Sequence, residues 1–138
     1  PADLEAVAAL ARRADPFGWS LRNFQDALAA GYIMTVIEAE ARIVGYFALM
    51  VVVDEAELLE IAVDPDFQGR GCGKALLKAA VAAARAQACR CVHLEVRVSN
   101  ERARKMYVSA GFCETGLRKN YYPTQNGREH AVLMRLDF

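Results

Sequence analysis

Between two hydrophobic stretches lies a glycine-rich segment, Gln68-Gly69-Arg70-Gly71-Cys72-Gly73-Lys74. Residues 58–63 before it are typical of a buried strand, and the Ala/Leu-rich residues 76–88 after it are typical of a helix. Glycines accept positive φ angles and let backbone N–H groups approach a ligand, and the N-terminus of the following helix adds further donors. The pattern therefore predicts a strand, an anion-binding loop and a helix, whose usual ligand is a phosphate or pyrophosphate.

The spacing of these glycines excludes two common nucleotide-binding loops. A Walker A loop would need glycine at 68 and serine or threonine at 75, where the chain has Gln68 and Ala75. A dinucleotide fingerprint would need glycine at 74 or 76, where the chain has Lys74 and Leu76. The remaining pattern, Q-x-x-G-x-G before a helix, resembles the GNAT acyltransferases, whose corresponding loop holds the pyrophosphate of acetyl-CoA. A tight turn without a ligand is the alternative.

Length and composition favour one compact domain. The chain has 138 residues, of which 54% are hydrophobic, so we expect residues 1–138 to form one domain with a real core. Lys and Arg together equal Asp and Glu together, at 17 each, so no net field attracts nucleic acid or an anionic membrane. No hydrophobic run reaches the roughly 20 residues of a membrane helix, and no signal-peptide pattern opens the chain. We expect a cytoplasmic protein without nucleic-acid or membrane partners.

The four cysteines, Cys72, Cys89, Cys91 and Cys113, contain no C-x-x-C pair. A disulfide framework and a zinc finger are therefore poorly supported. Cys91, His93 and Glu95 would share one face of a strand and could be imagined as metal ligands, but no second cluster supplies the others. We expect no metal, and reduced thiols that are mostly packed in the core.

Hydrophobic periodicity and turn residues predict four helices and six strands along the chain. Asp15-Pro16-Phe17-Gly18 is expected to end the first helix, Ser20 and Ser99 to cap the second and fourth, and residues 123–129 to form a long hairpin loop. Hairpins combined with strand–helix–strand units indicate an α/β fold with a mixed sheet. The predicted helices are 3–14, 20–30, 74–88 and 100–110, and the predicted strands are 32–38, 43–53, 57–63, 91–97, 112–122 and 130–138.

Motifs along most of the chain are similar to the RimI-type N-terminal-alanine acetyltransferases, GNAT enzymes that act on a small-subunit ribosomal protein. The resemblance implies a single-domain GNAT fold with a mixed, mostly antiparallel sheet flanked by helices. These enzymes begin with a strand, whereas Pro1-Ala2-Asp3 leads almost directly into a helix, so we expect a missing first edge strand or a trimmed chain. The motifs are Ile61-Ala62-Val63-Asp64-Pro65, the glycine loop, Leu94-Glu95-Val96-Arg97-Val98-Ser99-Asn100, Tyr107 with Gly111-Phe112, and Asn120-Tyr121-Tyr122-Pro123 with Gly127-Arg128-Glu129.

The resemblance also implies a co-substrate, acetyl-CoA, and an acceptor, the N-terminal segment of a ribosomal protein. We expect the enzyme to be a monomer or a weak oligomer. The residues implied to hold acetyl-CoA are Ile61, Ala62 and Val63 along the pantetheine, Gly69, Arg70, Gly71, Cys72, Gly73 and Lys74 around the pyrophosphate, and Asn100.

Three residues are candidates for proton transfer. The resemblance implies that Tyr107 protonates the leaving thiolate; it lies seven residues, about two helical turns, after Asn100, so both side chains point to one cleft. Glu95 matches the proton acceptor of the family. Glu60 interrupts an apolar run, where an unpaired charge is costly to bury, so it is the second candidate, or it cooperates with Glu95 through water. The alternatives are a core aromatic for Tyr107, a local helix cap for Asn100 and solvated charges for the glutamates.

An N-terminal amine is the favoured acceptor, because its pKa of about 7.7–8.0 lies below the roughly 10.4 of lysine. Trp19, Tyr121 and Tyr122 are expected to form the peptide-facing rim, although Trp19 could simply pack its helix and the tyrosines are good strand formers. Three functions stay open: a protein N-terminal acetyltransferase, a GNAT enzyme for a small amine or lysine, and a CoA-binding module without catalysis.

Overall fold

The computed structural model describes residues 3–15, 18–125 and 127–138. The helices and strands follow the predicted order, and a 3-10 turn, η1 (Pro65–Phe67), was not predicted. Pro16, Phe17 and Asn126, assigned to a helix stop and a loop, lie outside the described residues, as do Pro1 and Ala2. The elements are α1 (Leu4–Ala14), α2 (Leu21–Ala29), β1 (Ile33–Ala39), β2 (Arg42–Val52), β3 (Glu55–Val63), α3 (Cys72–Ala86), β4 (Cys91–Arg97), α4 (Glu101–Ser109), β5 (Cys113–Thr124) and β6 (Gly127–Asp137).

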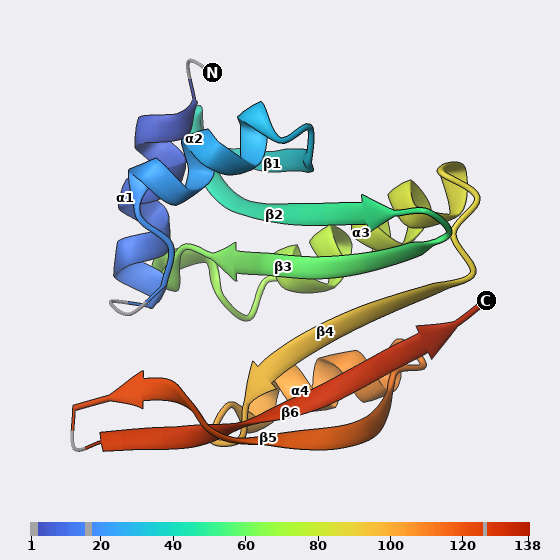
Figure 1. The fold of residues 1–138 in the computed structure, drawn as a ribbon. Helices are drawn as coiled ribbons and strands as arrows, with labels where there is room; N and C mark the ends of the chain where they lie inside the picture. The colour runs from blue at the N-terminus through green and yellow to red at the C-terminus, as the bar shows by residue number, and fades with distance from the viewer. Residues whose placement is uncertain (1–2, 16–17, 126) are drawn as a thin grey trace.

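The strands form one six-stranded sheet in the order β1-β2-β3-β4-β6-β5. Only β3 and β4 run parallel, so the sheet is mixed and mostly antiparallel, which confirms the predicted fold class. The first element described is α1, and β1 forms one edge of the sheet, at the top of Figure 1. No helix of the described residues is long and apolar enough to cross a membrane.

Helices cover both faces of this sheet (Figure 1). On one face α1 and α2 bury Leu10 and Phe24 against Tyr46 of β2. On the other face α3 and α4 bury Leu77 and Tyr107 against the larger core. Each helix thus buries one apolar face against the sheet, and for α1 the spacing of its apolar residues indicated this.

Local hydrogen bonds explain where two helices begin. The Ser20 hydroxyl accepts a bond from the Asn23 N–H at 3.3 Å, and the Asn23 side chain accepts one from the Ser20 N–H at 2.9 Å, which confirms the predicted cap. The prediction for Ser99 is wrong. Asn100 caps α4 instead, since its Oδ1 accepts a bond from the Ala103 N–H at 3.2 Å.

The predicted long loop at 123–129 is also wrong. β5 continues to Thr124 and β6 begins at Gly127, so most of those residues extend the hairpin. Pro123 pairs with Arg128 in this extension. Proline is tolerated there because β5 is the edge strand of the sheet, where one side needs no ladder donor.

The two parallel strands stay together over only part of their length. Glu55–Leu58 pair with Cys91–Leu94. Beyond these residues β3 continues to Val63 and β4 to Arg97, but the two strands no longer pair with each other. Figure 1 shows the two strands diverging beyond that point. A register shift next to Leu59 adds a bulge at the start of the divergence, as bulges often do beside functional sites. The backbone edge of β3 is thereby left open to a ligand.

Candidate active site

The glycine loop joins η1 to α3, and its backbone takes a positive φ angle at two glycines. Gly69 and Gly71 have φ angles of 80° and 83°, and Gly71 caps α3 without any side chain. A Cβ on Gly71 would meet nothing within 4 Å, so the backbone conformation, not lack of space, calls for glycine here. The first N–H groups of α3 have no partner within the helix and are available to an anion.

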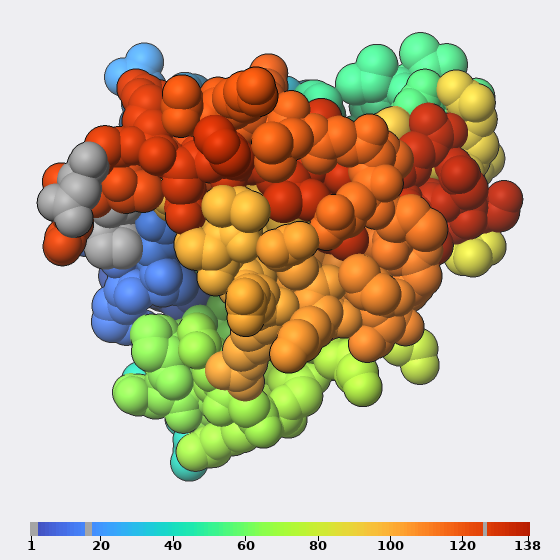
Figure 2. All heavy atoms as spheres, turned by 90° about the horizontal axis from the view of Figure 1, so that it is seen from below, coloured from blue at the N-terminus to red at the C-terminus, as the bar shows by residue number. Residues whose placement is uncertain are grey.

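One cavity of about 510 Å³ adjoins this loop and runs along the open edge of β3. Figure 2 shows the glycine-loop region in green, α4 in orange and the N-terminal segment in blue around a hollow. The cavity brings together most of the predicted site. Its predicted lining residues are Glu60, Ile61, Ala62, Val63, Gly69, Gly71, Gly73, Lys74, Asn100 and Tyr107.

Several predicted residues do not line this cavity: Arg70, Cys72, Glu95, Trp19, Tyr121 and Tyr122. The Arg70 guanidinium lies over the Phe67 ring, 4.7 Å from its centroid. Conversely, the sequence reasoning missed Asp15, Tyr46, Arg102 and Met106, which do line it. Arg102 places a second cation beside Lys74, but in the sequence it is one arginine among several on a helix.

Glu60 is a carboxyl group held inside this cavity. Its Oε1 accepts a hydrogen bond from the Tyr46 hydroxyl at 3.3 Å, and the Trp19 backbone N–H is a second donor. Burial raises the pKa of Glu60 to about 7, although both hydrogen bonds oppose that rise. Glu60 can therefore gain or lose a proton close to neutral pH.

Tyr107 projects from α4 into the same cavity and is only 5% exposed. Burial raises the pKa of its phenol, and the charge of Glu60 raises that pKa further. The hydroxyl therefore stays protonated at neutral pH and can donate a proton. Asn100 also lines the cavity while capping α4. Its side-chain oxygen already accepts the hydrogen bond from the Ala103 N–H, so the helix-cap alternative for this residue is confirmed.

Glu95 lies on β4 outside the cavity lining. Its Oε1 accepts a hydrogen bond from Arg118 Nη1 of β5 at 2.7 Å. Burial raises the pKa of Tyr122, and among the nearby charges Glu95 contributes most to that rise. Glu95 therefore faces the tyrosine pair on the hairpin, whereas Glu60 faces the cavity.

The predicted peptide rim divides into two groups. The Tyr121 and Tyr122 rings lie 5.0 Å apart, and the guanidiniums of Arg118 and Arg97 lie over them at 4.3 and 4.6 Å respectively. Trp19, by contrast, packs edge-on against Phe24 at 5.2 Å, which is the helix-packing alternative for this residue.

Arg97 connects this rim to the end of α1. Its Nη1 donates to the Pro123 carbonyl at 2.8 Å, and its Nη2 lies 3.5 Å from Asp15 Oδ2. A third partner is Glu129, at 3.3 Å. Arg97 therefore links the hairpin to Asp15, which lines the cavity.

Comparison with known proteins identifies relatives of the whole chain. The model of the acetyltransferase (GNAT) family matches residues 4–112. The [ribosomal protein bS18]-alanine N-acetyltransferase of Salmonella typhimurium is 40% identical over 97% of this chain and 90% of its own length.

Two solved structures extend the comparison. The crystal structure of the ribosomal-protein-S18-alanine N-acetyltransferase from Escherichia coli superposes with a TM-score of 0.93 and 38% identity, over 99% of this chain and 88% of that one. YncA from Salmonella typhimurium, solved with its cofactor acetyl-CoA, superposes with a TM-score of 0.81, over 99% and 88%. At 20% identity the likeness to YncA shows the fold alone.

Proposed function

This chain belongs to the acetyltransferase (GNAT) family, and on that premise we propose that it transfers the acetyl group of acetyl-CoA to the N-terminal alanine of ribosomal protein bS18. One observation supports the proposal: the glycine loop, an ionisable carboxyl, Glu60, and a buried phenol, Tyr107, line one cavity. The acceptor comes from relatives that match almost the entire chain. We further propose that residues 1–138 act as one such domain.

Acetyl-CoA would lie along the open edge of β3. The pyrophosphate would take the N–H groups at Gly69 to Lys74, with the side chains of Lys74 and Arg102 as cationic partners. Pantetheine would run along the backbone of Ile61, Ala62 and Val63, which β4 leaves unpaired. Asn100 would contact the cofactor from the start of α4. The reaction takes no metal ion, since an amine attacks a thioester directly.

The acceptor amine would enter from the side of the hairpin, past Tyr121 and Tyr122, with Trp19 supporting the opposite wall. We propose Glu95 as the proton acceptor, direct or through one water, because it lies beside Tyr122 and a hydrogen bond from Arg118 holds its Oε1 in place. Glu60 is the second carboxylate. With a pKa of about 7 it is only partly ionised at neutral pH.

Attack of the free amine on the thioester carbonyl gives a tetrahedral intermediate. When the intermediate collapses, the carbon–sulfur bond breaks and the thiolate of CoA leaves with the electron pair. Tyr107 would donate its phenolic proton to that sulfur and regain one from solvent. The products are an N-acetylated protein and free CoA.

The partner proposed here is the N-terminal segment of bS18, and we place the enzyme in the cytoplasm, where ribosomal proteins are made. It would act as a monomer or weak oligomer and without direct contact to nucleic acid. The peptide enters as an extended chain beside the β5–β6 hairpin.

The test is release of CoA thiol and mass gain on a synthetic peptide of the first residues of bS18. We expect acetylation of the peptide with a free alanine amine and none of the same peptide with a blocked amine and a free lysine. Faster turnover of a polyamine or of lysine would favour a different acceptor class. Tight acetyl-CoA binding without transfer to any of these amines would contradict catalysis.

A further inference from the structure

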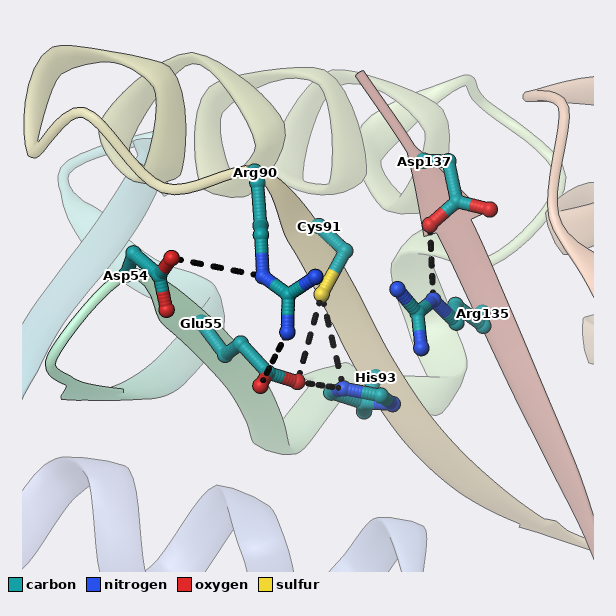
Figure 3. A network of polar contacts seen from close by, with 7 residues as sticks. All are labelled: Asp54, Glu55, Arg90, Cys91, His93, Arg135 and Asp137. Atoms are coloured by element: carbon teal, nitrogen blue, oxygen red, sulfur yellow. Dashed lines mark hydrogen bonds and ion pairs between the residues drawn. The ribbon is translucent and has the colours of Figure 1, made fainter.

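A thiol, an imidazole and a carboxylate meet at the opposite end of β3 and β4, away from the cavity. Glu55 pairs with Cys91 in the parallel register, and His93 lies two residues further along β4 on the same face. Figure 3 shows the three side chains pointing toward one another. The sequence analysis considered Cys91, His93 and Glu95 as metal ligands and expected no metal, because no second cluster supplied the other ligands. The parallel register supplies Glu55 instead, while Glu95 turns to Arg118.

The three side chains converge on one point. Cys91 Sγ lies 3.4 Å from His93 Nε2 and 3.5 Å from Glu55 Oε1, and Nε2 lies 2.6 Å from the same Oε1. A catalytic triad would use the two ring nitrogens separately, one for the thiol and one for the carboxylate. Here both contacts go to Nε2, so this is not a nucleophile with its base. One ligand atom from each residue facing a common centre is the arrangement of a metal site.

We propose that Glu55, Cys91 and His93 bind a zinc ion that ties β3 to β4 at their paired end. Tetrahedral zinc has bonds of about 2.3 Å to sulfur and 2.0–2.1 Å to nitrogen or oxygen, which puts its ligand atoms about 3.3–3.6 Å apart. The two separations that involve Sγ, 3.4 and 3.5 Å, already fit. The shorter Nε2–Oε1 separation is a hydrogen bond, and it lengthens when the metal replaces its proton. Water fills the fourth position.

Neighbouring side chains hold Glu55 for this role. Arg90 Nη2 donates to Glu55 Oε2 at 2.9 Å, which leaves Oε1 directed at the centre. Arg90 is itself held by Asp54, at 3.3 Å. Such partners orient metal-binding carboxylates and are part of the site.

The charge around the centre suits a divalent cation. The carboxylates of Asp54, Glu55 and Asp137 outnumber the guanidiniums of Arg90 and Arg135 by one (Figure 3). A Cys91 thiolate adds a second negative charge, so one divalent ion brings this network to neutrality. Glu57, which pairs with His93 in the parallel register, lies outside this count and places one further carboxyl group near the site.

The donor set selects zinc among divalent ions, because thiolate, imidazole and carboxylate together are typical zinc ligands and hard ions such as Mg²⁺ avoid thiolates. Zinc would displace the hydrogens on Cys91 Sγ and His93 Nε2, which both point at Glu55 Oε1. The thiol proton goes to solvent, and the proton on a neutral imidazole moves to Nδ1 through solvent. The His93 and Glu55 side chains are each 37% exposed, so the ion reaches the centre from water.

The test is titration of the purified protein with ZnCl₂, and with CoCl₂ as a spectroscopic probe. We expect one metal ion per chain and, with cobalt, a thiolate-to-metal charge-transfer band. Because binding releases a proton, the heat measured by calorimetry should change with the ionisation enthalpy of the buffer. His93→Gln should weaken zinc binding at least tenfold, and Cys91→Ser should remove the charge-transfer band. Either variant should also lose the rise in melting temperature that zinc gives the unmodified protein.

Two other thiols serve as matched controls. Cys89→Ser removes a buried thiol close to the cluster, and Cys113→Ser removes an exposed one on β5. Both should keep the unmodified affinity and spectrum. Absence of binding, or binding that depends on Cys113 and not on His93, would overturn the proposal. Since His93 is half-exposed, its variant keeps the test decisive if Cys91→Ser fails to fold.

Discussion

The strands β3 and β4 place different chemical groups at the two ends of their pair. At the paired end, Glu55, Cys91 and His93 satisfy one another across the parallel ladder. At the diverging end the ladder stops, the backbone of β3 faces a cavity, and Glu60 there has a pKa of about 7. Because β3 and β4 no longer pair at this end, the backbone edge of β3 is open to a ligand, and the ionisable Glu60 lies in the same cavity. We therefore expect changes at the diverging end to alter catalysis, and changes at the paired end to leave it intact.

Replacing Tyr107 should have the largest effect. Tyr107→Phe keeps the ring that packs against Phe112 but removes the proton donor from the cavity. We expect kcat to fall by roughly 10²–10⁴, the usual range for general acid catalysis, with little change in acetyl-CoA affinity. Pre-steady-state and steady-state CoA release with the bS18 peptide measures both. A phenylalanine variant with near-normal turnover would leave Tyr107 only a packing role.

The two glutamates near the divergence should differ in effect. We expect Glu95→Gln to lower kcat by about 10²-fold and Glu60→Gln by less, with both variants still binding acetyl-CoA. The loss in Glu95→Gln should shrink as pH rises, because the amine then loses its proton unaided. If Glu60 were the main base, the unmodified enzyme would instead show an inflection near pH 7 that Glu60→Gln abolishes. The pH profiles of kcat for the three proteins decide this.

The glycine loop should govern binding and not chemistry. Gly71→Val puts a β-branched residue at a φ of 83°, a conformation that such residues avoid, and so displaces the N–H groups at the start of α3. We expect acetyl-CoA affinity to fall at least tenfold while the domain stays folded. Calorimetric titration, with circular dichroism as the control for folding, measures this. Unchanged affinity in a folded variant would rule out the loop as the phosphate site.

Many of the elements and cavity residues could be predicted from the sequence, because local sequence patterns indicate them. The glycine spacing, the alternation in residues 91–97 and the break of the apolar run at Glu60 each carry their own physical reason. The errors at Ser99 and at 123–129 arose where two neighbouring residues could both cap, or where a proline suggested a loop although an edge strand accepts it.

The contacts between distant segments could not be predicted in this way. Tyr46 reaches Glu60 through the β2–β3 register and its bulge, and Glu55 meets Cys91 through the parallel register of β3 and β4. A one-residue change in register turns every side chain to the other face, so such partners follow only from the folded sheet. Arg118, the partner of Glu95, lies 23 positions further along the chain on β5.

The burial of Glu60 should also affect the free energy of unfolding, by a smaller amount than the catalytic changes above. The pKa of Glu60 rises from an ordinary 4.5 to about 7 on folding, so folding favours its protonated form. That stabilisation is complete below about pH 4.5 and is lost as the pH rises through 7. Glu60→Gln should therefore be more stable than the unmodified protein by about 1–3 kcal/mol at pH 8, and the difference should shrink toward pH 5. Urea unfolding at both pH values tests the sign, and an equal difference at both would contradict the burial.

The smallest effect should come from the same chemical change at the paired end. Asp137→Asn also converts a carboxylate to an amide, but Asp137 lies at the end of β6, and its side chain, which contacts Arg135 at 2.6 Å, is 71% exposed. Exposed ion pairs of this kind contribute little to stability, and neither residue lines the cavity. We expect kcat and acetyl-CoA affinity within about twofold of the unmodified values and no resolved shift in the urea midpoint. A tenfold loss of kcat in Asp137→Asn would mean that the paired end transmits its electrostatics along β4 to the acetyl-transfer site, so that the two ends act as one unit.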